Sequence, residues 1–217
     1  MLYHNYIFLS SKKTIFDIPE NHITDFQKKF IQEIEKEKRV IVHTYTTVGL
    51  KANTSLLLWF QSDELQTIQN LLNNLLHTQL GKHIEITHTL FGMTRLTQYS
   101  SRSVTHLHTN RKGGKYLIIY PFTKTKEWHM LPFEKRKELM IGHMKIGGNY
   151  PQIQQLLVYS YGIDDNEFIV SYETDALTDF QQLVMDLRSD PVRAFTLNDT
   201  PVFTCVYRPV SEALHFL

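Results

Sequence analysis

Hydrophobic and polar positions along the chain follow two periods, one typical of strands and one typical of helices. Runs of branched and aromatic residues bounded by polar residues predict β-strands at residues 3–10, 40–48, 55–61, 84–93, 115–122, 153–162, 168–173 and 202–207. Apolar residues spaced three and four apart predict helices through residues 23–34, 65–75, 131–146 and 176–188.

The predicted elements repeat one order, strand–helix–strand–strand–helix–strand, in each half of the chain. This order predicts two ferredoxin-like modules, residues 1–96 and 115–217, in an α+β fold. Residues 97–114 are rich in Ser, Thr, His, Asn and Arg and indicate a linker or a long functional loop. Two such sheets can close face to face into a dimeric α+β barrel with the helices outside.

Composition excludes several classes of function. The chain has 217 residues and a formal net charge of +1, which argues against nucleic-acid binding by bulk charge. No apolar run approaches the roughly 20 residues of a membrane helix, so we expect no membrane partner. The first residues show no secretory signal, and the single cysteine, Cys205, allows neither a disulfide framework nor a cysteine zinc site. We therefore expect a cytoplasmic protein.

The most distinctive candidate residue is His143, on the predicted helix 131–146. Its neighbours one turn away include Leu139 and Ile146, so it projects from an apolar stripe. A histidine in this position is more often a core residue than a ligand. The nearby glycines, Gly142 and Gly147, are costly in a helix and permit a flat macrocycle to approach closely. Iron held by one neutral imidazole is a common arrangement in heme proteins.

Several ordered motifs between residues 115 and 207 resemble the chlorite dismutase superfamily, and within it the coproheme decarboxylases. These motifs are Tyr-Pro-Phe-Thr-Lys at 120–124, Trp-His-Met-Leu-Pro at 128–132, the helical segment that ends at His143, and Tyr-Ser-Tyr-Gly-Ile-Asp-Asp at 159–165. The resemblance implies the dimeric α+β barrel and a homo-oligomer, a ring of five subunits. It also implies a porphyrin substrate, iron coproporphyrin III (coproheme), which hydrogen peroxide oxidises to heme b.

The resemblance also implies roles for individual residues. His143 takes the position of the axial ligand of the heme iron, and Gln155 lies on the distal side, where true chlorite dismutases have arginine. Tyr120 matches the tyrosine that carries the radical in decarboxylation. The remaining matches lie around the porphyrin. Lys124 matches a lysine beside that tyrosine, Trp128 matches a tryptophan near the axial histidine, and Arg188 matches an arginine on the propionate side.

The chain departs from the family pattern at several places. Four residues are missing between Lys124 and Trp128, and one is missing between His143 and Gln155. Arg193 replaces a family serine. The two arginines of the inter-module loop have no clear match, and the candidates to anchor propionates there are Arg95, Arg102, His106, His108 and Arg111.

Ordinary structural roles compete with each assignment. Tyr120 and Trp128 are also typical core or rim aromatics, and Lys124 lies in a Lys-Thr-Lys segment that suits a solvated loop. Only one of Gln154 and Gln155 can face inward on a strand. Arg188 is also favourable at a helix C-terminus because of the helix dipole.

Three functions fit these residues. The first is peroxide-dependent decarboxylation of coproheme, which Tyr120 together with Lys124 favours. The second is a heme-binding, chlorite dismutase-like protein with weak peroxidase or chlorite-degrading activity. The third is a non-enzymatic heme carrier or a structural barrel, against which His143 on an apolar face argues.

Overall fold

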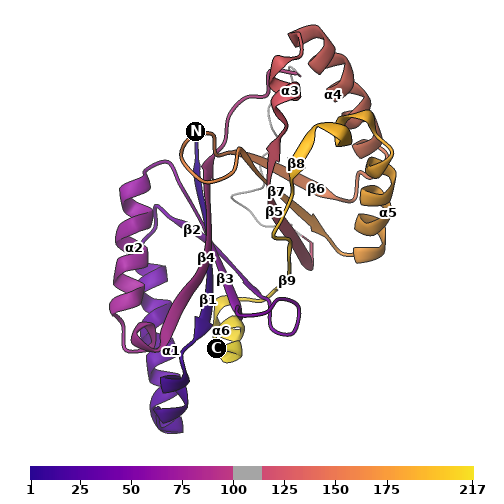
Figure 1. Cartoon of the computed structure of the whole chain (residues 1–217). Coiled ribbons are helices and arrows are strands. Elements are labelled where there is room, and N and C mark those ends of the chain that lie inside the picture. Colours follow the sequence, from indigo (N-terminus) through magenta and orange to yellow (C-terminus); the bar gives the residue numbers. More distant parts are fainter. Residues whose placement is uncertain (100–113) are drawn as a thin grey trace. The chain divides into compact units, whose positions relative to one another are not determined.

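The computed structural model describes residues 1–99 and 114–217, and its contacts divide the chain into two compact units (Figure 1). Unit 1 combines Met1–Met93 with Phe203–Leu217, and unit 2 is Thr94–Val202. Within the described residues, no helix is long and apolar enough to cross a membrane.

Unit 1 is an antiparallel sheet with two long helices on one face. The sheet has the strand order β4-β1-β3-β2-β9, and Figure 1 shows α1 and α2 beside each other along it. The elements, in chain order, are β1 (Tyr3–Ser11), α1 (Glu20–Lys36), β2 (Ile41–Thr46), β3 (Leu56–Ser62), α2 (Leu65–His77), β4 (Ile84–Met93), β9 (Phe203–Tyr207) and α6 (Val210–Ala213).

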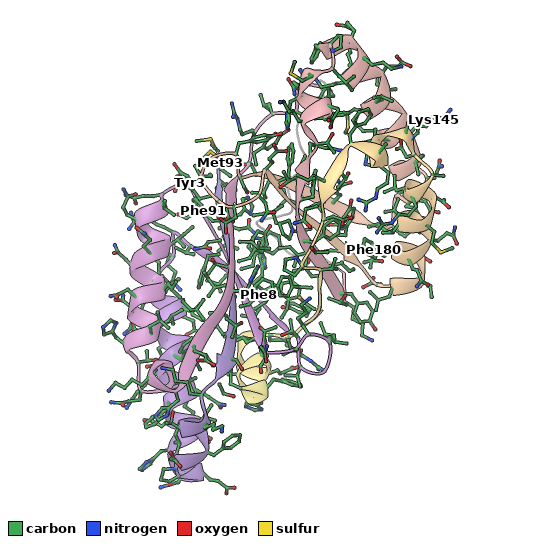
Figure 2. The ribbon with its side chains drawn as sticks, in the orientation of Figure 1. Tyr3, Phe8, Phe91, Met93, Lys145 and Phe180 are labelled. Carbon is green, nitrogen blue, oxygen red and sulfur yellow. The ribbon has the colours of Figure 1, made fainter. Side chains whose placement is uncertain are left out.

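Alternation along the strands builds the core of unit 1. Leu56, Leu58 and Phe60 of β3 face the helices, where Phe30 of α1 and Ile68 of α2 are fully buried against them. The opposite face of the sheet is aromatic, and Phe8 stacks on Phe203 with ring centroids 3.9 Å apart. On the helix-facing side, Tyr3 stacks on Phe91 of β4, and both residues are labelled in Figure 2. Both faces of this sheet are therefore densely packed.

Unit 2 is a smaller antiparallel sheet, of strand order β6-β7-β5-β8, with α4 and α5 side by side next to it (Figure 1). The elements are β5 (Tyr116–Lys124), α3 (Lys126–Met130), α4 (Phe133–Gly147), β6 (Gln154–Tyr159), β7 (Phe168–Thr174), α5 (Leu177–Arg188) and β8 (Thr196–Asn198). Further 3-10 helices span Lys13–Asp17, Leu80–His83, Pro191–Phe195 and Leu214–Phe216.

The helices of unit 2 cover their sheet far less completely than those of unit 1. Helix α4 has no fully buried residue, and α5 buries only Leu183. Figure 2 shows Phe180 of α5 directed toward the sheet, whereas Lys145 of α4 points away from it. The face of α4 that carries His143 is half-buried throughout and consists of Arg136, Leu139, Met140, His143, Ile146 and Gly147. A planar group could complete the burial of this face.

The predicted α+β class is confirmed, and every predicted strand and helix is present within a few residues of its expected bounds. The short elements α3 and β8 were not predicted. The last strand, β9, pairs with β2, and its contacts group residues 203–217 with unit 1.

Candidate functional site

The centre of the candidate site is the pair formed by His143 and Asp190. Nδ1 of His143 lies 2.8 Å from Oδ2 of Asp190, and the Asp190 side chain is almost completely buried. Asp190 precedes the 3-10 helix Pro191–Phe195, and its Oδ1 accepts a hydrogen bond from the backbone N–H of Val192 at 3.0 Å. The cap thus fixes the carboxylate, and the carboxylate fixes the imidazole ring.

This pair determines which nitrogen of His143 is available. A carboxylate only accepts hydrogen bonds, so Nδ1 carries the hydrogen and Nε2 keeps its lone pair. Burial lowers the pKa of His143, and the hydrogen bond to Asp190 opposes this shift. The ring therefore presents a neutral, oriented nitrogen, which is the form that ligates a metal. The side chain as a whole is 30% exposed.

Lys124 is the second unusual group in the site. Lys124 is only 8% exposed. Its Nζ lies 4.8 Å from the ring centroid of Trp128 and 5.8 Å from that of Phe122. Burial, and then repulsion from Arg193, lowers the pKa of Lys124 to about 8. Among the described residues, no carboxylate lies within ion-pair distance of this ammonium. The site therefore has a buried cation that is not in direct contact with a carboxylate, although the charges of Asp190 and Glu167 partly compensate it.

Trp128 is a buried aromatic residue that packs against this cation. It is 3% exposed on the short helix α3, and its ring packs against Lys124 on one side and Phe195 on another, 5.6 Å between ring centroids. Thr125 caps the helix. The charge of Lys124 interacts electrostatically with both Asp190 and His143. Lys124, Trp128 and His143 therefore lie near the segment that begins at Asp190.

Tyr120 lies on the helix-facing side of β5. It stacks on Tyr172 with ring centroids 6.1 Å apart, and the two phenols share a hydrogen bond. Burial raises the pKa of Tyr120, so the phenol stays protonated at neutral pH. The charges nearest to it are those of Arg188, Arg193 and Asp199.

Two arginines share one aspartate beside Tyr120. Nη1 of Arg193 is 2.7 Å from Oδ2 of Asp199, and Nη1 of Arg188 is 3.7 Å from the same oxygen. Because two arginines share one aspartate, this group of three side chains carries a net charge of +1 beside Tyr120. Arg193, which departs from the family pattern, is thus close to both Tyr120 and Lys124.

Gln155 shares a face with these residues, and Gln154 does not. Gln155 is directly opposite Tyr172 in the register of β6 and β7, so both side chains project on the same side of the sheet as Tyr120. Gln155 is exposed, whereas its neighbour Gln154 lies on the other face with the buried Leu156. The structure therefore selects Gln155 as the glutamine on the helix-facing side.

Some functional residues were missed from the sequence, and some predictions lie outside the described residues. Asp190 was missed, although an aspartate followed by proline is a recognisable cap signal. Tyr172 was missed because cross-strand register is invisible in one sequence. The loop candidates Arg102, His106, His108 and Arg111 fall within residues 100–113, outside the described parts of the chain.

The donor set fits an iron porphyrin with carboxylate side chains. Within residues 1–99 and 114–217, no three His, Cys, Asp or Glu side chains gather closely enough to hold a metal ion. A Cβ built on Gly147, which shares the half-buried face of α4 with His143, meets nothing within 4 Å. The buried ammonium of Lys124 suits a further carboxylate.

Comparison with known proteins agrees with this reading. Residues 20–208 match the family model for chlorite dismutase. The coproheme decarboxylase of Mycolicibacterium smegmatis is 24% identical over 183 residues, which cover 84% of this chain and 79% of that protein.

Solved structures show the same fold. A mutant chlorite dismutase from Candidatus Nitrospira defluvii superimposes with a TM-score of 0.91 at 23% identity, over 99% of this chain and 94% of that chain. Chlorite dismutase from the same organism in complex with imidazole has a TM-score of 0.90, at the same identity and coverage. Because the family model spans most of the sequence, and the superimposable structures cover nearly all of it, this chain belongs to the chlorite dismutase family.

Proposed function

We propose that this protein binds iron coproporphyrin III and oxidises two of its propionates to vinyl groups, giving heme b, with hydrogen peroxide as the oxidant. The observation that carries the proposal is the His143–Asp190 pair on the half-buried face of α4, in which Nδ1 of His143 is engaged and the side chain is 30% exposed. A relative at 24% identity that bears the name coproheme decarboxylase supports the choice of reaction within the family.

His143 is the proposed axial ligand of the iron. The Nδ1–H···Asp190 hydrogen bond holds the ring in one orientation and increases the electron density on Nε2. Gly147 has no side chain, and this lets a flat ring lie close to the helix. When bound, the iron porphyrin supplies the redox centre that reacts with peroxide.

Lys124 and Arg188 are proposed to hold propionates. The Lys124 ammonium is buried, resting on Trp128, so a carboxylate there would form a charge-assisted hydrogen bond in a poorly solvated place. Arg188 is half-exposed and only 3.7 Å from Asp199, and a propionate can compete for it. Trp128 keeps the ammonium in place through the face of its ring.

Tyr120 is the proposed redox residue. Oxidation of its phenol to a radical allows it to take a hydrogen atom from the β-carbon of a neighbouring propionate. The carboxylate is then lost as CO2, and a carbon–carbon double bond forms. Each propionate gives up two electrons, one hydrogen peroxide accepts them, and two molecules of water form. Tyr172 orients the phenol by stacking and by a hydrogen bond.

A second candidate function is a heme-binding protein with weak peroxidase or chlorite-degrading activity. The similarity to solved chlorite dismutases favours it. Gln155 argues for the first proposal, since its amide offers hydrogen bonds without the permanent charge that would hold an oxyanion.

The test is to add iron coproporphyrin III and hydrogen peroxide to the purified protein and to follow the product by mass. We expect successive losses corresponding to two decarboxylations. The His143→Ala variant should lose the Soret spectrum of the bound iron porphyrin, and His129→Ala, which changes an exposed histidine on α3, should not. Peroxide consumption without any change in porphyrin mass would instead support the peroxidase.

The assembly and location are also proposals. We propose a homo-oligomer of five subunits, because the resemblance implies one, and a cytoplasmic location, which the single buried thiol of Cys205 supports. Light scattering at micromolar concentration should report a mass of several subunits. A monomer under those conditions would exclude the ring.

A further inference from the structure

A guanidinium without a counter-ion lies on the same face of α4 as His143. Arg136 precedes His143 by seven residues, which is two helical turns or about 10 Å along the axis. Its Nε is buried and has no hydrogen-bond partner. Among the residues that the structure describes, no carboxylate lies within ion-pair distance of this side chain. An arginine placed in this way is costly unless something absent from the chain pairs with it.

An aromatic cluster lies next to this arginine. Tyr161 interacts electrostatically with Arg136, and its ring packs edge-on against Phe168, 4.9 Å between centroids. Tyr159 also packs on Phe168, at 5.4 Å, and projects from the helix-facing side of β6. Tyr99 stacks on Phe133, in the first turn of α4. The surroundings are therefore aromatic and partly dry, which strengthens any charged hydrogen bond formed there.

The polar groups nearby are donors rather than acceptors. Burial raises the pKa of both Tyr159 and Tyr161, so both hydroxyls keep their hydrogens at neutral pH. Arg95, whose charge interacts with Tyr159, adds a second cation. Glu167, whose charge acts on Tyr161, is already engaged, since Oε1 is 2.8 Å from Nε2 of His129 and Oε2 accepts the backbone N–H of Lys124 at 2.8 Å.

We propose that Arg136, together with the phenols of Tyr159 and Tyr161, forms a carboxylate-binding site that holds one propionate of the bound porphyrin. The inference rests on the proposed function and deepens it. It gives the substrate a second anchoring point, distinct from the one at Lys124, Arg188 and Arg193. A porphyrin with carboxylates on only one edge would then use just one of the two points.

The test compares two fluorescent probes that differ only in their side chains. Zinc coproporphyrin III carries four propionates, and zinc octaethylporphyrin carries none. The Arg136→Met variant removes the charge and keeps the length of the side chain. Lys145→Met removes a charge from the same helix on the side that points away from the sheet (Figure 2), and so serves as the matched control.

Arg136→Met should weaken the binding of zinc coproporphyrin III by about ten- to a hundredfold, the range for a charge-assisted hydrogen bond. Its affinity for zinc octaethylporphyrin and its Tm should match those of the unchanged protein. Lys145→Met should change neither affinity. Tyr161→Phe, which removes one donor, should weaken only the carboxylated probe, by a few-fold.

Two results would overturn the inference. Equal weakening of both probes by Arg136→Met would make the arginine a structural residue, and unchanged affinity for both would remove it from the site. A different result would contradict the proposed function itself, namely that the unchanged protein binds neither probe. Addition of inorganic phosphate should compete weakly at most, and complete displacement by phosphate would make this a general anion site and not a propionate site.

Discussion

The buried carboxylate of Asp190 lies 2.8 Å from Nδ1 of His143 while its other oxygen caps the following 3-10 helix. One side chain thus connects the end of α5 to the inward face of α4. The connection orients the imidazole as well as burying it, because groups outside its own helix set the direction of Nε2.

The first prediction concerns this carboxylate. Asp190→Asn keeps an acceptor for the imidazole and for the cap but removes the negative charge. We expect the reduction potential of the bound iron to rise and porphyrin affinity to fall by about ten- to a hundredfold, the usual effect of outer-shell partners. Spectroelectrochemical titration measures the potential. Asp186→Asn, in the last turn of α5 and away from His143, is the control and should leave the potential unchanged.

The second prediction separates binding from chemistry at Tyr120. Tyr120→Phe removes one oxygen and preserves the stacking on Tyr172. Affinity for iron coproporphyrin III should stay within about twofold of the original, while vinyl formation falls by at least 100-fold, as expected when a reacting group is removed. Titration of the Soret band and product mass provide the two measurements. Normal turnover would transfer the redox role to another residue, and Tyr172→Phe would be the next variant to test.

The third prediction is a pH dependence from Lys124. Burial lowers its pKa to about 8, so the ammonium that would bind a propionate is progressively lost above that pH. Affinity for the carboxylated porphyrin should therefore fall above pH 8, by up to about tenfold per pH unit. Lys124→Met should bind weakly and with little dependence on pH between 7 and 9. Lys126→Met, an exposed lysine two residues away, should retain the original profile.

The same group affects the stability of the free protein in the opposite sense. An unfolded lysine keeps its proton up to about pH 10.5, whereas the folded one loses it near 8. The unfolded state thus binds more protons in this window, and the free energy of unfolding should rise with pH relative to Lys124→Met. Denaturant unfolding at pH 7 and pH 10 checks the sign. The lowered pKa would be contradicted if the free energy of unfolding of the unchanged protein, minus that of Lys124→Met, were lower at pH 10 than at pH 7.

Local pattern predicted the elements well, because their period and composition are strong signals. Helix α4 was placed from its spacing alone, and His143 was recognised on its apolar stripe. The partner of His143 could not be found in the same way, since Asp190 is 47 residues away and no periodicity links the two. The pairing of β9 with β2 was likewise hidden, because it joins strands that are far apart in the sequence.

Charge placement shows a further limit of sequence reasoning. Lys124 lies in a polar segment that is equally compatible with a solvated loop, and only the fold reveals that its ammonium rests on Trp128. Arg193 was noted as a departure from a family serine, but its ion pair with Asp199 depends on the turn after α5. Burial and electrostatics depend on three-dimensional neighbours, which a single sequence does not contain.

The last prediction is that the protein degrades chlorite poorly, and it depends on Gln155. Chlorite degradation requires a small anion, and then a transient hypochlorite, to be held over the iron. A guanidinium would do this with a permanent charge and a rigid fork of donors. Gln155 projects on the same face as Tyr120 but supplies only a neutral amide. Charged hydrogen bonds are worth roughly 1.5–3 kcal/mol and neutral ones about 1 kcal/mol.

The missing contribution is about 1 to 2 kcal/mol, or roughly five- to thirtyfold in rate from this contact alone. Hypochlorite that escapes would also bleach the porphyrin early. We therefore expect little oxygen from chlorite with the heme-loaded protein and more from Gln155→Arg. Gln152→Arg adds the same charge at an exposed turn and should not raise the yield. Rapid, sustained oxygen release by the unchanged protein would contradict the prediction, because a neutral amide would then be sufficient to retain hypochlorite.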